Sequence, residues 1–266
     1  MKPRRTRPLE ALARTVRTSV LALLALAALA PVHAEDGVIR IRIGNSTPSI
    51  TGSGKLQSET RAVSGFQAIT LRGSMNLVLR QGTREGVELR ADDNLLPLIE
   101  TQVVDRNGVR TLEIGTKKGA SYVSRNPLVA SVDLITLSAL TITGAGDAVS
   151  EALKTPSLRV AITGSGNVRL HQLSADEVSA KVSGSGDIEF SGRTARLGVS
   201  IAGSGDVNTR GLEADEVSVS VAGSGDASVT ARKTLGVSIA GSGSVVYSGE
   251  PVVSSSIAGH GSVRKQ

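Results

Sequence analysis

A pair of glycines separated by one residue recurs through the C-terminal half of the chain and limits the fold more than any other feature. The pairs are Gly144/Gly146, Gly164/Gly166, Gly184/Gly186, Gly203/Gly205, Gly223/Gly225, Gly241/Gly243 and Gly259/Gly261. The first glycines are 20, 20, 19, 20, 18 and 18 residues apart. Apolar residues alternate with small or polar ones on both sides of each pair, and this period of two is typical of a β-strand. A repeat of this length is too short for a four-stranded propeller blade.

These repeats predict an all-β solenoid with coils of about 18–20 residues. Inward Val, Ile, Leu and Ala side chains would stack on equivalent residues about 4.8 Å away in the next coil. A longer, two-coil unit is also visible, because Ala175–Ser179 recurs unchanged as Ala214–Ser218, and Leu197–Gly205 recurs as Leu235–Gly243. An antiparallel sandwich with glycine-rich hairpins is the alternative. It accounts less well for strands that keep their register and residue type through successive repeats.

The segment before these repeats is β-like but less regular. A polar break at Asp92–Pro97 indicates a turn or short helix, Asp105–Gly108 indicates a hairpin, and Thr116–Asn126 is expected to be a loop. We therefore predict one solenoid domain over residues 62–264, with an irregular half (62–135) and a regular half (136–264). The strands expected in the irregular half lie near 66–70, 77–79, 87–89, 99–104 and 109–114.

The N-terminus has the three parts of a secretory signal peptide. Six basic residues lie between Lys2 and Arg17, an apolar run covers Val20–Ala30, and small residues precede a cleavage site after Ala34. The apolar run is about half of the roughly 20 residues that span a bilayer, which favours cleavage over an uncleaved anchor. We predict that residues 1–34 are removed and that residues 35–61 form a flexible linker.

Removal of the signal peptide changes the charge balance. It takes six of the 30 Lys and Arg residues and one of the 24 Asp and Glu residues, which leaves 24 basic and 23 acidic residues. A net charge of +1 gives no reason to expect nucleic-acid binding. The whole chain has no Cys, no Trp, two Tyr and two Phe. This composition excludes a disulfide scaffold, a Cys-ligated metal site and a thiol nucleophile.

The residue after each glycine pair is usually acidic and would form a column along the solenoid. Asp147, Asp187, Asp206 and Asp226 occupy this position, together with Asn167, Ser244 and Ser262. Carboxylates about 5 Å apart repel each other, and Ca²⁺ could relieve the repulsion because it binds several oxygen ligands. The alternative is structural, since Asp and Asn suit turns and accept local backbone hydrogen bonds. The calcium ladder and the structural column both remain open from the sequence.

Other polar residues give little sign of catalysis. His171 and His260 are far apart in the chain and lack metal-ligand spacing. The pairs Asp176/Glu177 and Asp215/Glu216 read as solvated turn charges. No phosphate-binding loop follows, because the glycine pairs are not set between a strand and a helix. We therefore expect no enzyme, no catalytic residue and no cofactor.

The residues of the irregular half carry a resemblance to a known family. Phe66–Gly82, then Val87–Leu96 and the Gly-Ser-Gly-Asp repeats resemble the bacterial GIN-domain family, whose members are described as head domains of auto-transporter adhesins. The similarity covers residues 62–264. It implies a right-handed, parallel β-helix-like fold in an exported protein without established enzymatic activity.

Together these observations predict an exported, non-enzymatic binding or scaffolding protein of the cell envelope, with adhesion as the role that the family suggests. It would lie in the periplasm or at the cell surface, as a monomer or an end-to-end dimer, with an envelope glycan or protein as its partner and no transmembrane segment after cleavage. Two alternatives stay open. One is a glycan-active enzyme on a β-helix, and the other is a calcium-stabilised structural module.

Overall fold

The structure is a computed structural model that describes residues 49–266. The predicted signal peptide and the first part of the predicted linker lie outside the described residues. The rest of that linker differs from the expectation. Ser49–Thr51 (β1) pairs with Ser121–Val123 (β8), within the segment expected to be a loop, and Leu56–Arg61 (β2) pairs with β5 (Gly86–Asp92). These short polar strands are fixed by pairing with distant partners, which a local pattern does not reveal.

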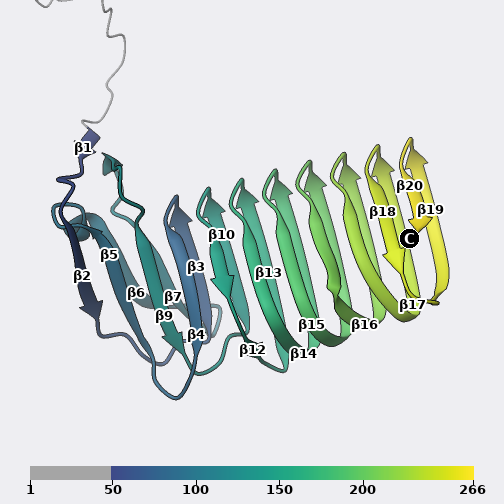
Figure 1. Ribbon diagram of the computed structural model, residues 1–266, viewed down its shortest axis with the longest axis horizontal. Helices are drawn as coiled ribbons and strands as arrows, with labels where there is room; N and C mark the ends of the chain where they lie inside the picture. The colour runs from purple at the N-terminus through teal and green to yellow at the C-terminus, as the bar shows by residue number, and fades with distance from the viewer. Residues whose placement is uncertain (1–48) are drawn as a thin grey trace, which may run out of the picture. The chain divides into compact units, whose positions relative to one another are not determined.

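The described chain is a β-solenoid, as the repeats predict, and each coil has two faces (Figure 1). Face A holds the strands that run up to a Gly-x-Gly pair, and face B holds those that follow one. Adjacent coils pair in parallel and in register, so that Gly144, Gly164, Gly184, Gly203, Gly223, Gly241 and Gly259 form one column. We call the edge that carries the Gly-x-Gly pairs the glycine corner.

The regular coils follow one another in chain order. Face A contains β3 (Ala68–Gly73), β10 (Ala139–Gly144), β13 (Ser157–Gly164) and β19 (Val252–Gly259). Face B contains β4 (Asn76–Gln81), β11 (Ala148–Ser150), β12 (Leu153–Lys154), β18 (Ser244–Ser248) and β20 (Ser262–Lys265). Between them, β14 (Val168–Gly184), β15 (Ile188–Gly203), β16 (Val207–Gly223) and β17 (Ala227–Gly241) each begin on face B and continue around the opposite corner onto face A.

The irregular half contributes a coil that is out of sequence order. Val109–Thr116 (β7) pairs with β3, and Val129–Leu134 (β9) pairs with β4. On its other side, β3 pairs with β10, and β4 pairs with β11. The first coil in the chain is therefore second in the stack. The irregular half continues the same solenoid. No local sequence pattern predicts that β7 and β9 lie on the outer side of β3 and β4, or that the chain then returns to β10 on the other side.

The N-terminal end of the stack is closed by antiparallel strands. On face A, Ile99–Arg106 (β6) pairs with β7 through the predicted hairpin, where the Gly108 N–H donates to Asp105 Oδ1 over 2.8 Å. On face B, β5 and β2 extend the sheet beyond β9. The predicted break contains a short 3₁₀ helix (η1, Leu96–Leu98), and Leu95 and Leu96 are buried.

The core is a narrow column of aliphatic side chains. Val182, Ile201, Val221 and Ile239 occupy the same place in successive coils, and each is at most 1% exposed. Phe190 is the largest of the fully buried side chains. Stacking of like residues at the spacing of a parallel sheet explains why the composition needs few aromatic residues. Among residues 49–266, no helix has the length and apolar character needed to cross a membrane.

Candidate binding groove

The glycine corner is fixed by its backbone conformation. The first glycine of each pair in the regular coils has a positive φ, from 123° at Gly259 to 138° at Gly241. A Cβ at Gly184 would also overlap the carbonyl oxygen of Gly164 in the neighbouring coil. Both constraints exclude other residues, so the glycines are required by the architecture, as the sequence indicated.

The predicted Asp column does assemble at this corner. The N–H of Asp206 donates to Asp187 Oδ1 over 2.9 Å, and the N–H of Asp226 donates to Asp206 Oδ1 over the same distance. The equivalent bond from Asn167 to Asp147 Oδ1 is 2.9 Å. One side-chain oxygen from each coil thus accepts a backbone hydrogen bond from the next coil.

These bonds give the Asp column a structural task without deciding whether it binds a cation. The column continues through Asn167 Oδ1, which accepts from the Asp187 N–H, and ends where Ser244 donates to Asp226 from its N–H and its hydroxyl. In the part of the chain that the structure describes, no group of three or more His, Cys, Asp and Glu side chains is arranged to hold a metal. The calcium ladder of Asp147, Asp187, Asp206 and Asp226 stays a prediction.

The opposite corner of each coil, where the chain passes from face B back to face A, is charged, and the sign alternates from coil to coil. Along the stack, the charged residues at this corner are Lys154, then Asp176 and Glu177, then Arg193 and Arg196, then Glu213, Asp215 and Glu216, then Arg232 and Lys233, then Glu250. We call this edge the charged corner. The two-coil sequence repeat produces the alternation, because Asp-Glu recurs every second coil and basic residues occupy the coils between.

Ion pairs join neighbouring coils along the charged corner. Arg196 Nη2 lies 3.4 Å from Glu177 Oε2, and Lys233 Nζ lies 2.8 Å from Asp215 Oδ2. The hydrogen bond and positive charge of Lys233, opposed by some desolvation, lower the pKa of Asp215 below its ordinary value. Three of these side chains are more than half exposed and Asp215 is about one-third exposed, so each pair stabilises the fold only weakly. Of the four predicted turn charges, Glu177 and Asp215 pair with basic residues of the next coil, whereas Asp176 and Glu216 are exposed.

A groove runs along the charged corner. It has a volume of about 670 Å³ and is lined by residues of five successive corners, from Lys154 to Arg232. At about 4.8 Å per coil, the four intervals span roughly 19 Å. The side chains between its charged rims are small and uncharged. They are the buried Thr155 and Thr194, together with Pro156, Ala175 and Ala195. The Thr194 hydroxyl is already satisfied by the carbonyl of Arg196 at 3.1 Å.

The groove was not predicted from the sequence, where Asp176 and Asp215 were considered as separate turn charges, without Arg193 and Arg232. The signal was present in the 39-residue spacing between Asp176 and Asp215, because that spacing is two coils and places the residues between them on the coil between.

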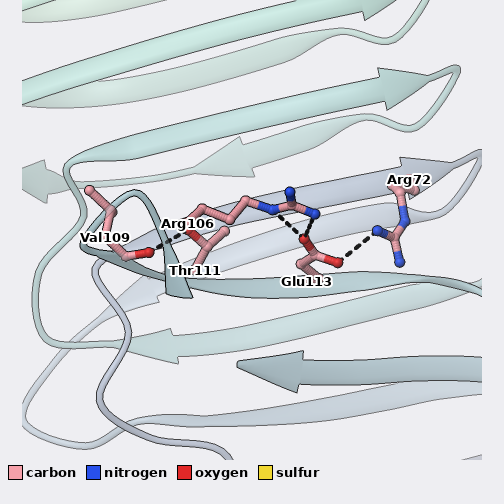
Figure 2. A network of polar contacts seen from close by, with 5 residues as sticks. All are labelled: Arg72, Arg106, Val109, Thr111 and Glu113. Atoms are coloured by element: carbon pink, nitrogen blue, oxygen red, sulfur yellow. Dashed lines mark hydrogen bonds and ion pairs between the residues drawn. The ribbon is translucent and has the colours of Figure 1, made fainter. Parts of the chain in front are cut away.

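A buried carboxylate lies apart from the groove, on face A near the N-terminal end (Figure 2). Glu113 on β7 is 2% exposed and lies between Arg106 of β6 and Arg72 of β3. Arg72 Nη1 donates to Glu113 Oε2 over 2.7 Å, and Arg106 Nε donates to Oε1. Burial alone would raise the pKa of Glu113, but the hydrogen bonds and charges of the two arginines lower it below the ordinary value. This network joins β3, β6 and β7 and explains how the out-of-order coil is held.

The two histidines, which the sequence did not mark as a site, lie far apart in the stack. His171 Nδ1 lies 3.5 Å from the Ser191 hydroxyl on face B, and His260 lies at the glycine corner of the last coil. Neither lines the groove along the charged corner.

Comparisons with known proteins agree with the architecture. Residues 65–251 match a family model described as "putative auto-transporter adhesin, head GIN domain". The chain belongs to this family. A crystal structure from Bacteroides fragilis NCTC 9343, described as that of a "putative adhesin", matches this GIN chain with 27% identity and a TM-score of 0.76. The match covers 82% of this chain and 100% of that one.

A second similar structure carries a different name. It comes from Parabacteroides distasonis ATCC 8503 and is described as a "putative lipid binding protein". It is 26% identical to the GIN chain, with a TM-score of 0.66, and the match covers 82% of this chain and all of that one. A search of curated proteins found no match. The family name is that of an adhesin, which is a binding protein.

Proposed function

We propose that this GIN protein is an exported, non-catalytic binding module of the cell envelope, and that it holds an extended polymer along the groove of the charged corner. The observation that carries the proposal is the form of the groove, which is open, follows the stacking axis and repeats its chemistry with the coils. A linear polymer fits such a site better than a compact small molecule does, because each further pair of coils offers one more equivalent set of contacts.

The alternating charges indicate what kind of polymer would fit. Charges of one sign recur every second coil, which is about 9.6 Å along the axis. That distance is comparable to one disaccharide of an extended glycan chain. The groove rims carry Lys154, Arg193 and Arg232 against Asp176, Glu213 and Asp215, so their formal charges cancel. We therefore favour a neutral or zwitterionic envelope glycan, such as a cell-wall strand with its attached peptides.

Sedimentation with isolated cell-wall sacculi tests this proposal. Ala195 is exposed in the groove, and Ala195→Tyr fills it without touching the core. Ala240→Tyr is the matched control, because Ala240 is also exposed but lies on face A near the glycine corner. We expect the native protein and Ala240→Tyr to sediment with the sacculi and Ala195→Tyr to stay in solution. Equal binding by all three proteins, or loss with Ala240→Tyr alone, would contradict a site in the groove.

Protease added to intact cells tests the location. Digestion of the native protein in intact cells would support a role in adhesion at the surface. Protection until the envelope is permeabilised would support a periplasmic scaffold instead. Retention of the protein in the cytoplasm would contradict the proposal in either form.

A further inference from the structure

The two ends of the solenoid differ. The N-terminal end is closed by β2, β5, β6 and η1, whereas the last coil, β19 and β20, has no strand beyond it in the part of the chain that the structure describes (Figure 1). Every residue of β19 is exposed, which is true of no other strand in the regular half. An unpaired edge of this kind is a template for strand pairing.

The open end is also apolar at its inner positions. Ile257 continues the buried column above Ile239 and is 43% exposed, and Val253 continues the column above Leu235 and is 38% exposed. On face B, Val263 continues the column above Val245 and is half-buried. Neighbouring coils cover the equivalent side chains elsewhere, so this end exposes apolar surface that one more layer of strands would bury.

We propose that a second copy of this chain covers the open end, in a two-fold dimer that places β19 of each copy beside β20 of the other. A two-fold axis parallel to the strands brings face A of one copy into line with face B of its partner. It preserves the direction of each strand, and because β19 and β20 run in opposite directions, the new pairs are antiparallel. Antiparallel pairing is a favourable way to join two sheet edges.

This axis also determines the register. Ile257 and Val263 each lie three residues from His260 at the centre of the last glycine corner, so they stand at about the same height on opposite faces. Rotation about an axis parallel to the strands leaves the position of each residue along the strand direction unchanged. It therefore places Ile257 beside the partner's Val263. Because the contact occurs twice, four apolar side chains would close the open ends.

The charges favour this arrangement over the other two-fold dimer. Arg264 and Lys265 give β20 two positive charges, of which Lys265 pairs with Glu250 of its own chain, whereas β19 has no charged residue. An axis perpendicular to the faces would pair β20 with its own copy and place four basic residues on one strand pair, which is destabilising. The proposed axis instead places the basic strand β20 beside the uncharged strand β19 of the partner, which begins just after Glu250.

The proposed dimer, which is argued from the open end alone and requires no ligand, would also bring the two binding grooves together. The proposed axis keeps both glycine corners on one side and both charged corners on the other. Two grooves would then lie along the same edge, and a polymer long enough to reach both would bind with a higher effective concentration at the second.

Sedimentation equilibrium of the exported chain tests the dimer. We expect a concentration-dependent dimer, and Ile257→Lys should raise its dissociation constant at least about tenfold, with little change in melting temperature because Ile257 is at the end of the stack. Val123→Lys is the control, since Val123 is also an exposed apolar residue but lies on β8 in the irregular half. A monomer at all concentrations would overturn the proposal.

Cysteine cross-linking tests the arrangement, because the chain has no native cysteine. Ser256 and Arg264 lie four residues on either side of His260, so they face each other across the proposed interface. We expect the double variant Ser256→Cys/Arg264→Cys to form a disulfide-linked dimer and neither single variant to do so. A cross-link in either single variant would overturn this arrangement. A dimer that survives Ile257→Lys but is lost when residues 35–48 are deleted would show that the N-terminal segment, and not β20, covers the edge.

Discussion

At the scale of single residues, the fold depends most on the first glycine of each pair. Gly184 has a φ of 133°, and a Cβ there would overlap the backbone of Gly164. We expect Gly184→Ala to destabilise the protein by at least about 2 kcal/mol, because it adds backbone strain and a steric clash. Gly198→Ala is the matched control, since a Cβ there meets nothing within 4 Å. Urea unfolding that shows equal midpoints for the two variants would contradict this account of the glycine corner.

Substitutions in the Asp column form a second test at this scale, because a structural role and a calcium-binding role predict different effects on stability. Asp206 accepts the N–H of Asp226 through one oxygen, which Asn can also supply. Asp206→Asn should therefore keep most of the stability, whereas Asp206→Ala should lose about 1 kcal/mol. If the column holds calcium, the native protein will melt at a higher temperature with Ca²⁺ than with a chelator, and Asp206→Asn will reduce that difference. Identical melts would end the calcium hypothesis.

Glu113 should make the stability dependent on pH. Its pKa is lower in the folded protein than in the unfolded chain, so its stabilising contribution is present above the unfolded value of about 4.3 and is lost as the pH falls through the folded value. Glu113→Gln should cost about 2 kcal/mol at neutral pH, and the difference from the native protein should shrink below about pH 4. Glu189→Gln is the control, because its pair with Arg169 is half exposed at 3.6 Å and is worth at most about 1 kcal/mol. A pH-independent cost for Glu113→Gln would contradict this assignment.

At the scale of the coils, the two-coil repeat should be removable as a unit. Deletion of residues 197–234 joins Arg196 to Leu235, restores the same local sequence and keeps the alternating signs at the charged corner, since Glu250 then follows Arg196. We expect a folded, shorter solenoid with the same circular dichroism per residue and a modestly lower melting temperature. Deletion of residues 207–215 is the control, because it breaks the register between coils. Equal loss of folding in both would contradict the modular account.

The sequence predicts the elements of the regular half well, and the reason is physical. Gly-x-Gly fixes one corner, and strict alternation fixes which side chains point inward, so residues 136–264 could be assigned to coils without a structure. The coil formed by β7 and β9 could not be placed, because its position before β3 and β4 depends on pairings between residues about 40–55 apart in the chain. The strands β1 and β2 were missed for the same reason.

The candidate groove was only partly predictable, unlike the regular half, which was predicted well, and the β7/β9 coil, which could not be placed. Each of its charges is visible in the sequence, but Arg193 and Glu213 become neighbours only when the repeat is read one coil at a time. Their 3.6 Å ion pair is a property of the stack and not of either local segment. The Gly-x-Gly motif made the glycine corner easy to predict, whereas the groove lies at the charged corner, which has a less regular sequence.

At the scale of the whole molecule, we propose that the charged corner is the surface that binds. Hydrogen exchange of the exported chain, measured with and without solubilised cell-wall fragments, tests this proposal, because it reports on each coil separately. We predict slower exchange on binding at residues 174–176, 193–195 and 213–215, and unchanged exchange at the glycine corner. Protection at the glycine corner or across face A, with none at these three segments, would contradict the account.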